Sequence, residues 1–151
     1  MEGAIPTALQ GLRVLDLSTS FAGAWCARLL ADAGAVVATR EPHPLRAVGP
    51  FDDDGRSIPA LAALAHRERL DLEAGDASWP ERFAAADIVI DSAPAGSADR
   101  TWIDGFDKGG AVHVMITPHG LSGSRSHWPG NELTADALSG WASVNGLADR
   151  E

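Results

Sequence analysis

Three aspartates occupy positions where a carboxylate could take part in chemistry. Asp16 and Asp91 close short apolar runs that are typical of buried strands, and Asp136 stands beside a glycine-containing loop. A carboxylate can attack an activated carbonyl carbon when it is desolvated and backbone donors await the developing oxyanion. Asp16 is the most suggestive, because doubly wound folds bind ligands at the carboxyl ends of their strands. The structural interpretation is preferred, since a strand-end carboxylate more often caps a neighbouring loop or helix.

The turn over residues 18–24 is the best candidate for binding a phosphorylated ligand. It follows the first apolar run and begins a helix, where free backbone amides and the helix dipole suit phosphate groups. A plain helix cap explains the same residues equally well. Arg40 and Arg46 flank the loop after the second apolar run, and guanidinium groups suit phosphate oxygens. For either arginine alone, a solvated surface position is the alternative interpretation.

Histidine, tryptophan and cysteine give weaker signals. The five histidines lack the spacing of a zinc or iron site, so no metal is expected. His119 could act as a general base, but without an identified partner it reads as a polar loop residue. Trp128 and Trp141 could stack on adenine, although Trp141 shares helical spacing with Leu138 and is predicted to lie in the core. Cys26 is the single cysteine, which excludes an internal disulfide.

Composition excludes several classes of protein. The 151 residues are 45% hydrophobic and 22% charged, which suits one globular domain over 1–151. The net charge of -9 would repel a phosphate backbone, so nucleic acid is not an expected partner. No apolar run approaches the roughly 20 residues of a membrane-spanning helix, and Glu2 stands where a secretory signal needs basic residues. A soluble protein of the cytoplasm without membrane contact is expected.

The order of elements predicts an α/β fold. Residues 12–17 and 35–39 read as buried strands, and a helix over 22–33 joins them, with Trp25, Leu29 and Leu30 on one stripe. Such a unit favours parallel pairing and a right-handed crossover. The charged, breaker-rich segment 41–57 is predicted to be an exposed loop.

Similar patterns continue through the rest of the sequence. Strands are predicted over 67–72, 87–91 and 111–117, and short helices over 58–65 and 79–85, with a further helix face from Trp102, Ile103 and Phe106. A last helix begins at Asn131 or Thr134 and ends at 145–146. The sequence therefore predicts a doubly wound, mostly parallel, Rossmann-like sheet with helices on both faces.

Three ordered blocks carry a family signature. The first reads Leu-Gln-Gly-Leu-Arg-Val-Leu-Asp-Leu over 9–17 and continues through 22–23, 29–35 and 41–42. The second reads Ala-Asp-Ile-Val-Ile over 86–90, and the third reads Ile-Thr-Pro-His-Gly-Leu-Ser-Gly over 116–123 and continues through 137–146. Together they resemble the class III CoA-transferases, a family that includes formyl-CoA and carnitine CoA-transferases and an α-methylacyl-CoA racemase branch.

The resemblance implies CoA or an acyl-CoA as the ligand. The residues expected to face it are Ser18, Thr19, Ser20, Ala22, Gly23, Arg46, Ser92 and Ala93. Arg46 matches a family arginine, whereas Arg40 stands at a position that is usually apolar. The family usually has Glu-Asn-Phe-Arg-Pro-Gly where residues 91–96 read Asp-Ser-Ala-Pro-Ala-Gly. Weakened or altered CoA binding follows, because one lost neutral hydrogen bond costs about 0.5–1.5 kcal/mol.

The resemblance also implies a reaction. In the family an aspartate attacks the acyl-CoA thioester, so that CoA moves between two acids. That aspartate lies beyond the region matched by 140–146, and the family's chains are longer. The resemblance therefore implies that this chain corresponds to an amino-terminal part of the family, which lacks the catalytic aspartate and has an incomplete sheet. No catalytic residue is assigned. The alternatives are a non-catalytic CoA- or acyl-CoA-binding domain and a dimerisation domain.

The expected assembly follows from the same resemblance. Family chains interlock in pairs, which implies a homodimer or a second chain that supplies the missing half. The acyl donor, the acceptor acid and the choice between transfer and racemase chemistry stay open.

Overall fold

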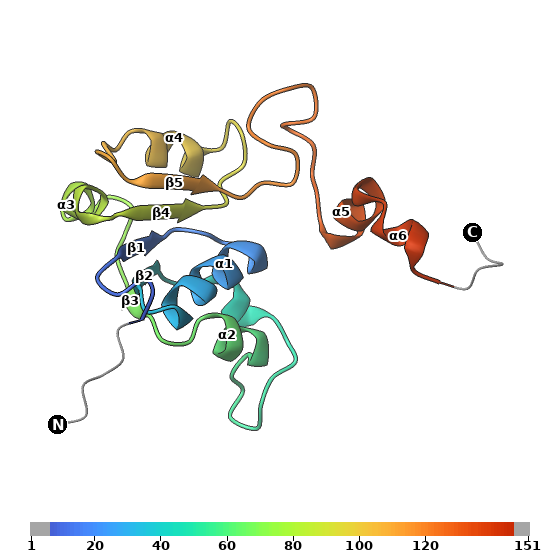
Figure 1. Cartoon of the computed structure of the whole chain (residues 1–151), viewed down its shortest axis with the longest axis horizontal. Coiled ribbons are helices and arrows are strands. Elements are labelled where there is room, and N and C mark those ends of the chain that lie inside the picture. The colour runs from blue at the N-terminus through green and yellow to red at the C-terminus, as the bar shows by residue number, and fades with distance from the viewer. Residues whose placement is uncertain (1–6, 147–151) are drawn as a thin grey trace.

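Five parallel strands form one sheet in the order β3-β2-β1-β4-β5, and the computed structural model describes residues 7–146. The strands are β1 (Arg13–Asp16), β2 (Val36–Arg40), β3 (Glu68–Leu70), β4 (Ile88–Asp91) and β5 (Val112–Met115). From β1 the chain moves outward to β2 and β3 and then returns to β4 on the other side of β1 (Figure 1). The strand order therefore reverses between β1 and β4, where doubly wound folds bind their ligands.

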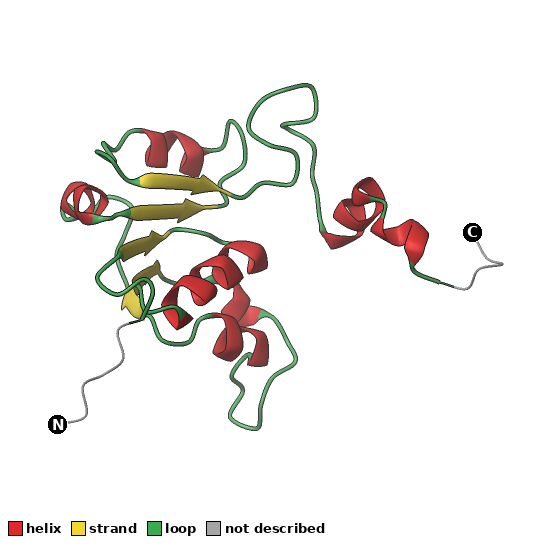
Figure 2. Ribbon diagram, in the orientation of Figure 1, coloured by secondary structure: helices red, strands yellow, loops and turns green. Residues whose placement is uncertain are grey.

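Helices cover both faces of this sheet, as predicted (Figure 2). Helices α1 (Phe21–Asp32) and α2 (Ile58–Ala63) follow β1 and β2, and α3 (Trp79–Ala85) and α4 (Ala98–Asp104) precede and follow β4. Val14 packs in one core cluster with Ala27 of α1, while its neighbour Leu15 packs in another with Phe83 of α3. Successive strand residues point to opposite faces, so the two clusters lie on opposite sides of the sheet.

The helix starts follow the sequence signals. Ser20, Ser57 and Ser97 each precede a helix, and each side-chain oxygen accepts a backbone hydrogen bond from the helix that follows. The predicted helix over 79–85 matches α3, and the one over 58–65 ends earlier, at Ala63. Among residues 7–146, no helix is long and apolar enough to cross a membrane.

The last predicted helix is two helices, α5 (Glu132–Ser139) and α6 (Trp141–Val144). Asn131 caps α5 reciprocally with Thr134, so the predicted start at Asn131 is confirmed. The break falls at Gly140, whose φ of 80° is left-handed and is most easily adopted by glycine. These helices pack on each other, away from the sheet (Figure 1).

The prediction that Trp141 lies in the core was wrong, and the apolar stripe on α1 is only partly buried. In the α1 stripe, Leu30 packs against the core, but Trp25 and Leu29 are 44% and 57% exposed. Helix α1 covers the sheet mainly with small residues such as Ala27, which allow close packing, whereas Phe21, Trp25 and Leu29 are exposed. Trp141, predicted to lie in the core, is 59% exposed because α6 does not pack on the sheet.

Candidate functional site

The loops after β1 and after β4 meet at the point where the strand order reverses. The backbone N–H of Thr19 donates to Ser92 Oγ at 2.8 Å, and the two hydroxyl oxygens lie 3.1 Å apart. The N–H of Leu17 also donates to the carbonyl of Ile90 at 2.8 Å. The structure thus brings together the two loops that the sequence assigned to one ligand, although they are 73 residues apart between Thr19 and Ser92.

The first turn of α1 is held by short polar side chains. Ser20 Oγ accepts a 3.1 Å hydrogen bond from the N–H of Gly23. A Cβ at position 23 would lie 2.3 Å from Ser18 Cβ, so only glycine fits there. Ser18 Oγ is buried and has no hydrogen-bond partner within residues 7–146. Ala22 is exposed beside them on the same turn.

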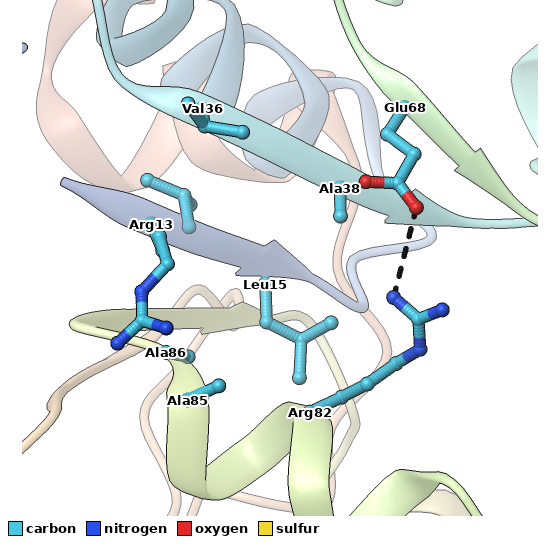
Figure 3. Close-up of a pocket in the computed structure, with 9 residues that line it drawn as sticks. Arg13, Leu15, Val36, Ala38, Glu68, Arg82, Ala85 and Ala86 are labelled. Carbon is cyan, nitrogen blue, oxygen red and sulfur yellow. Dashed lines mark ion pairs between the residues drawn. The ribbon is translucent and has the colours of Figure 1, made fainter. Parts of the chain in front are cut away.

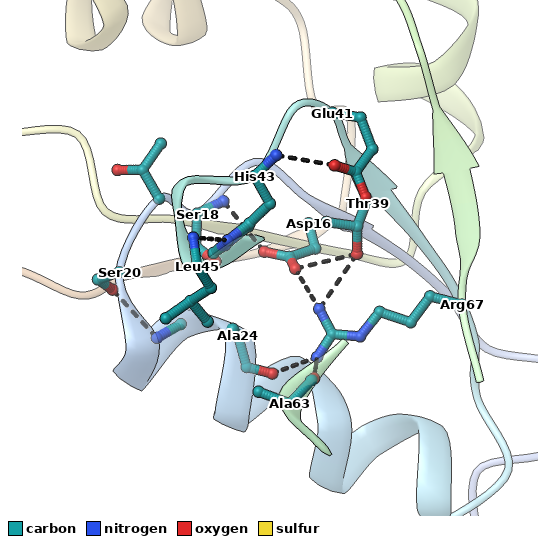
Figure 4. A network of polar contacts seen from close by, with 12 residues as sticks. Asp16, Ser18, Ser20, Ala24, Thr39, Glu41, His43, Leu45, Ala63 and Arg67 are labelled. Atoms are coloured by element: carbon teal, nitrogen blue, oxygen red, sulfur yellow. Dashed lines mark hydrogen bonds and ion pairs between the residues drawn. The ribbon is translucent and has the colours of Figure 1, made fainter. Parts of the chain in front are cut away.

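Asp16, the most suggestive nucleophile in the sequence, has a structural role (Figure 4). It is fully buried, and its oxygens accept hydrogen bonds from the N–H of Ser18 at 3.0 Å, Thr39 Oγ1 at 3.1 Å and Arg67 Nη1 at 2.7 Å. Burial raises the pKa of Asp16, whereas the hydrogen bonds from Ser18 and the charge of Arg67 lower it; burial outweighs them. The preference for a capping role at Asp16 is confirmed.

The buried Arg67 is the counter-charge of Asp16 in this network (Figure 4). Its side chain is 1% exposed, and it also donates to the carbonyl oxygens of Ala24 in α1 and Ala63 at the end of α2. One guanidinium therefore ties β1, β2, α1 and α2 together beneath the candidate site. Sequence reasoning did not single it out.

Asp91 is used in a similar way at the end of β4. The fully buried carboxylate accepts hydrogen bonds from the N–H of Ala93 at 2.9 Å and from Arg100 Nη1 at 2.9 Å, and lies 2.5 Å from His113 Nε2. Arg100 also pairs with Asp104 at 2.8 Å. Both strand-end aspartates are therefore occupied by protein partners, and the second one fixes the Ser92–Ala93 loop.

The segment after β2 is exposed over 47–51 and 53–56, as its composition predicted, but its first residues are partly buried. Glu41 and His43 are buried, and the carboxylate of Glu41 binds Arg46 and the N–H of His43. Burial alone would raise the pKa of Glu41, but the hydrogen bonds and charge of Arg46 lower it overall. Pairing of this kind lets a charged segment fold against the body. Arg46 uses its Nε and Nη2 atoms for its bonds to Glu41, and its Nη1 atom has no hydrogen bond within the described residues.

A cleft of about 170 Å³ opens at the carboxyl ends of β1 and β2. Its walls include Ser18 and Thr19 from the first loop, Arg40 from β2, and Asp99 from α4. A larger hollow, of about 350 Å³, is lined by Pro94 and Ala95 of the loop after β4 and by Trp128 of the segment after β5. The predicted ligand-facing turn therefore borders a real cleft, and Trp128 stands near the second loop, whereas Trp141 is on α6.

A separate hollow lies on the sheet face between β1, β2 and α3 (Figure 3). Leu15, Val36 and Ala38 line its floor, and an ion pair of 3.7 Å between Glu68 and Arg82 crosses its rim. It is mainly apolar and contains none of the residues that the sequence predicted to face a ligand. It marks uncovered sheet surface rather than the candidate site.

Comparisons with known proteins identify relatives over the whole described chain. The sequence pattern of CoA-transferase family III matches residues 9–151. The chain is 31% identical to the succinyl-CoA:(R)-benzylsuccinate CoA-transferase subunit BbsE of Thauera aromatica, over 89% of this chain and 36% of that protein. It is 28% identical to the succinyl-CoA–D-citramalate CoA-transferase of Chloroflexus aurantiacus, over 96% of this chain and 39% of that protein.

A solved structure shows the same fold. The CAIB/BAIF family protein from Brucella suis superposes with a TM-score of 0.81 at 24% identity, over 97% of this chain and 43% of that one. This chain therefore spans less than half the length of the relatives that it matches.

Proposed function

Because the chain belongs to CoA-transferase family III, we propose that it binds CoA or an acyl-CoA across the carboxyl ends of β1 and β4. In this proposal residues 1–151 act as one domain that supplies the cofactor-holding part of a CoA-transfer site. The observation that carries it is the contact between Thr19 and Ser92, which joins the two candidate loops at the reversal of strand order.

Each candidate residue has a role suited to its position. Ser18, Thr19 and Ser20 lead into the first turn of α1, where the N–H of Gly23 is held by Ser20 Oγ. The amides that would donate to phosphate oxygens are therefore those of Phe21 and Ala22 at the start of the helix. Ser92 and Ala93 form the opposite side of the site, where the pantetheine chain that carries the thioester would lie. Arg46 keeps its Nη1 edge for a phosphate while its other nitrogens hold Glu41.

The chemistry needs a desolvated carboxylate with a free oxygen, and residues 7–146 place none at this site. Asp99 lines the cleft, but it is 66% exposed and lies 3.8 Å from Arg40. A nucleophilic carboxylate must reach the thioester carbonyl with a free oxygen. Asp16 and Asp91 are buried and bound to arginines, and Asp136 lies on α5, away from the sheet. We therefore propose that this chain holds CoA while another polypeptide segment supplies the nucleophile. The chemistry would be transfer of CoA between an acyl-CoA and a carboxylic acid, without a metal.

The surface supports an association with a second copy or a second chain. Phe21, Trp25 and Leu29 form an exposed apolar stripe on α1, and Leu133, Leu138, Trp141 and Val144 are exposed on α5 and α6. Large exposed apolar surfaces of this kind mark interaction sites. The similar protein BbsE is itself named as a subunit. A light-scattering mass of a single chain in solution would contradict this part of the proposal.

We also propose that the protein works in the cytoplasm. Its single cysteine, Cys26, is a free thiol, which is compatible with a reducing compartment. No nucleic-acid or membrane partner is included in the proposal.

The second candidate function is non-catalytic binding of CoA, or dimerisation. The observation that favours it is the pairing of both strand-end aspartates with buried arginines. Catalytic transfer by the chain, alone or with a partner, would exclude it.

Calorimetry with CoA tests the proposed function. Weak binding is expected, because Ser92 and Ala93 replace residues that usually contact CoA in the family, and Arg46→Ala should weaken it further. Added salt should weaken it too, because a phosphate contact near the surface is screened. An absence of binding heat at millimolar CoA would contradict the proposal.

A further inference from the structure

Arg40 lines the cleft beside the first loop and is held there loosely. Its guanidinium lies over the Trp102 ring at 5.0 Å from the centroid, and its Nη1 is 3.8 Å from Asp99 Oδ1. A separation of 3.8 Å is too long for a hydrogen bond. Within residues 7–146 no hydrogen bond uses the guanidinium, whose side chain is 29% exposed. Arg40 is thus positioned by stacking while its N–H groups stay available.

The other arginines near the site are engaged more tightly. Arg67 and Arg100 donate to buried aspartates at 2.7 and 2.9 Å, and Arg46 binds the buried Glu41. Arg46 also lines a different hollow, next to Ser57, which precedes α2. Arg40 is the arginine that shares the cleft with Ser18 and Thr19.

The size of the cleft limits what it can take. Its volume is about 170 Å³, whereas sites that enclose a whole small molecule have volumes of about 300–1,000 Å³. A single charged group therefore fits better than a nucleotide. To bind such a group, Arg40 would give up its contact with Asp99. That carboxylate is 66% exposed, and an exposed ion pair contributes little to stability.

We propose that Arg40 anchors the terminal phosphate monoester of CoA, with the guanidinium turning from Asp99 to the phosphate oxygens. The 3'-phosphate is the terminal group, and as a monoester it carries nearly two negative charges, more than either internal phosphate of the diphosphate. A small cleft beside a free guanidinium suits it, and the diphosphate remains at the first turn of α1. This inference rests on the proposed function, since it assigns one group of the same ligand.

A comparison of CoA with 3'-dephospho-CoA, which lacks only this phosphate, tests the assignment. Calorimetric Kd values are measured for both compounds on the unaltered chain, Arg40→Gln, Asp99→Asn and the control Arg13→Ala. Arg13 is an exposed arginine at the opposite ends of the strands. Circular dichroism of each variant shows whether it is folded.

The expected result is selective. Arg40→Gln should raise the Kd for CoA about tenfold and leave that for dephospho-CoA within about twofold, because a hydrogen bond to a charged group is lost for only one compound. Asp99→Asn, which frees Arg40 and removes a repelling charge, should tighten CoA alone. Arg13→Ala should alter neither.

Other outcomes overturn the assignment. An equal loss for both compounds on Arg40→Gln, or no loss for either, would show that Arg40 does not read this phosphate. If Arg40→Gln does not fold, unchanged CoA affinity in Asp99→Asn overturns it independently. Binding of neither compound to the unaltered chain would instead reject the proposed function together with this inference.

Discussion

Thr19 and Ser92 are joined by a 2.8 Å hydrogen bond from the N–H of Thr19 to Ser92 Oγ, with their hydroxyl oxygens 3.1 Å apart. The contact links the end of β1 to the end of β4 where the strand order reverses. Ser92 therefore holds the two loops together at this point. Asp16 and Asp91 are the last residues of β1 and β4. Their carboxylates accept hydrogen bonds from the N–H groups of Ser18 and Ala93 and so fix the start of each loop.

Ser92→Ala should loosen this junction. We expect the free energy of unfolding to fall by about 0.5–1.5 kcal/mol, the range for one neutral hydrogen bond, and CoA binding to weaken with it. Urea unfolding and calorimetry measure the two effects. Ser143→Ala is a matched control, because among the described residues that hydroxyl bonds only to the backbone carbonyl of Gly140, at the start of the exposed helix α6. Equal effects of the two substitutions would contradict a special role for Ser92.

Gly23→Ala should disturb the first turn of α1. The added Cβ would lie 2.3 Å from Ser18 Cβ and 2.5 Å from its Oγ, so Ser18 must move. Overpacking of this kind costs about 1–3 kcal/mol, measurable by urea unfolding. Gly75→Ala is the control, because nothing lies within 4 Å of a Cβ there. Unchanged stability and CoA binding in Gly23→Ala would contradict the described turn.

Arg67→Met should be strongly destabilising. It would leave the buried carboxylate of Asp16 without its counter-charge, a change that costs about 3–5 kcal/mol. The double variant with Asp16→Asn should recover part of this loss, because no buried charge is left unpaired. Urea unfolding of both variants measures the difference. A loss below about 1 kcal/mol in Arg67→Met would place the pair near solvent and contradict its burial.

His43 should make the protein less stable as pH falls. Burial lowers the pKa of His43 below its usual 6.5, although Asp16 and Glu41 act in the opposite direction. The folded state therefore keeps the ring neutral while the unfolded chain takes up a proton near pH 6.5. Its contribution to stability is complete above that value and is lost as pH falls from it toward the lower pKa of the folded state.

Unfolding measured between about pH 5 and 7 tests this, with His43→Gln as the comparison. The difference between the two pH profiles isolates His43 from the carboxylates nearby. Parallel profiles would show that the ring titrates normally. The stabilising effect of Glu41, whose pKa is lowered, should persist until the pH falls below 4.5.

The sequence predicted the α/β fold and the first candidate loop from local signals, whereas the second candidate loop, at Ser92 and Ala93, was predicted from the family resemblance. Apolar runs marked β1, β2, β4 and β5, and Ser18 and Ser20 marked the start of α1. The meeting of Ser92 with Thr19 follows from parallel pairing of β1 with β4, which the resemblance to a doubly wound family implied.

Long-range pairing could not be read from the sequence. Arg67 contacts Asp16 across 51 positions, and nothing near Arg67 in the sequence distinguishes it from a surface arginine. The burial of Glu41 and His43 was missed because charged residues and prolines in a segment normally indicate exposure. Exposure of Trp25 and Leu29 was missed because spacing defines a stripe but not which surface covers it.

The most direct test of the central claim is a transfer assay with the purified chain alone. The chain is incubated with acyl-CoA donors and acceptor acids, acyl-enzyme is trapped with hydroxylamine, and mass spectrometry searches for a modified aspartate. We predict CoA binding without transfer and without modification, because Asp16 and Asp91 are buried in ion pairs and Asp136 lies on α5. Sustained transfer by the chain alone, abolished by changing one of those three aspartates to alanine, would contradict the claim that its nucleophile comes from elsewhere.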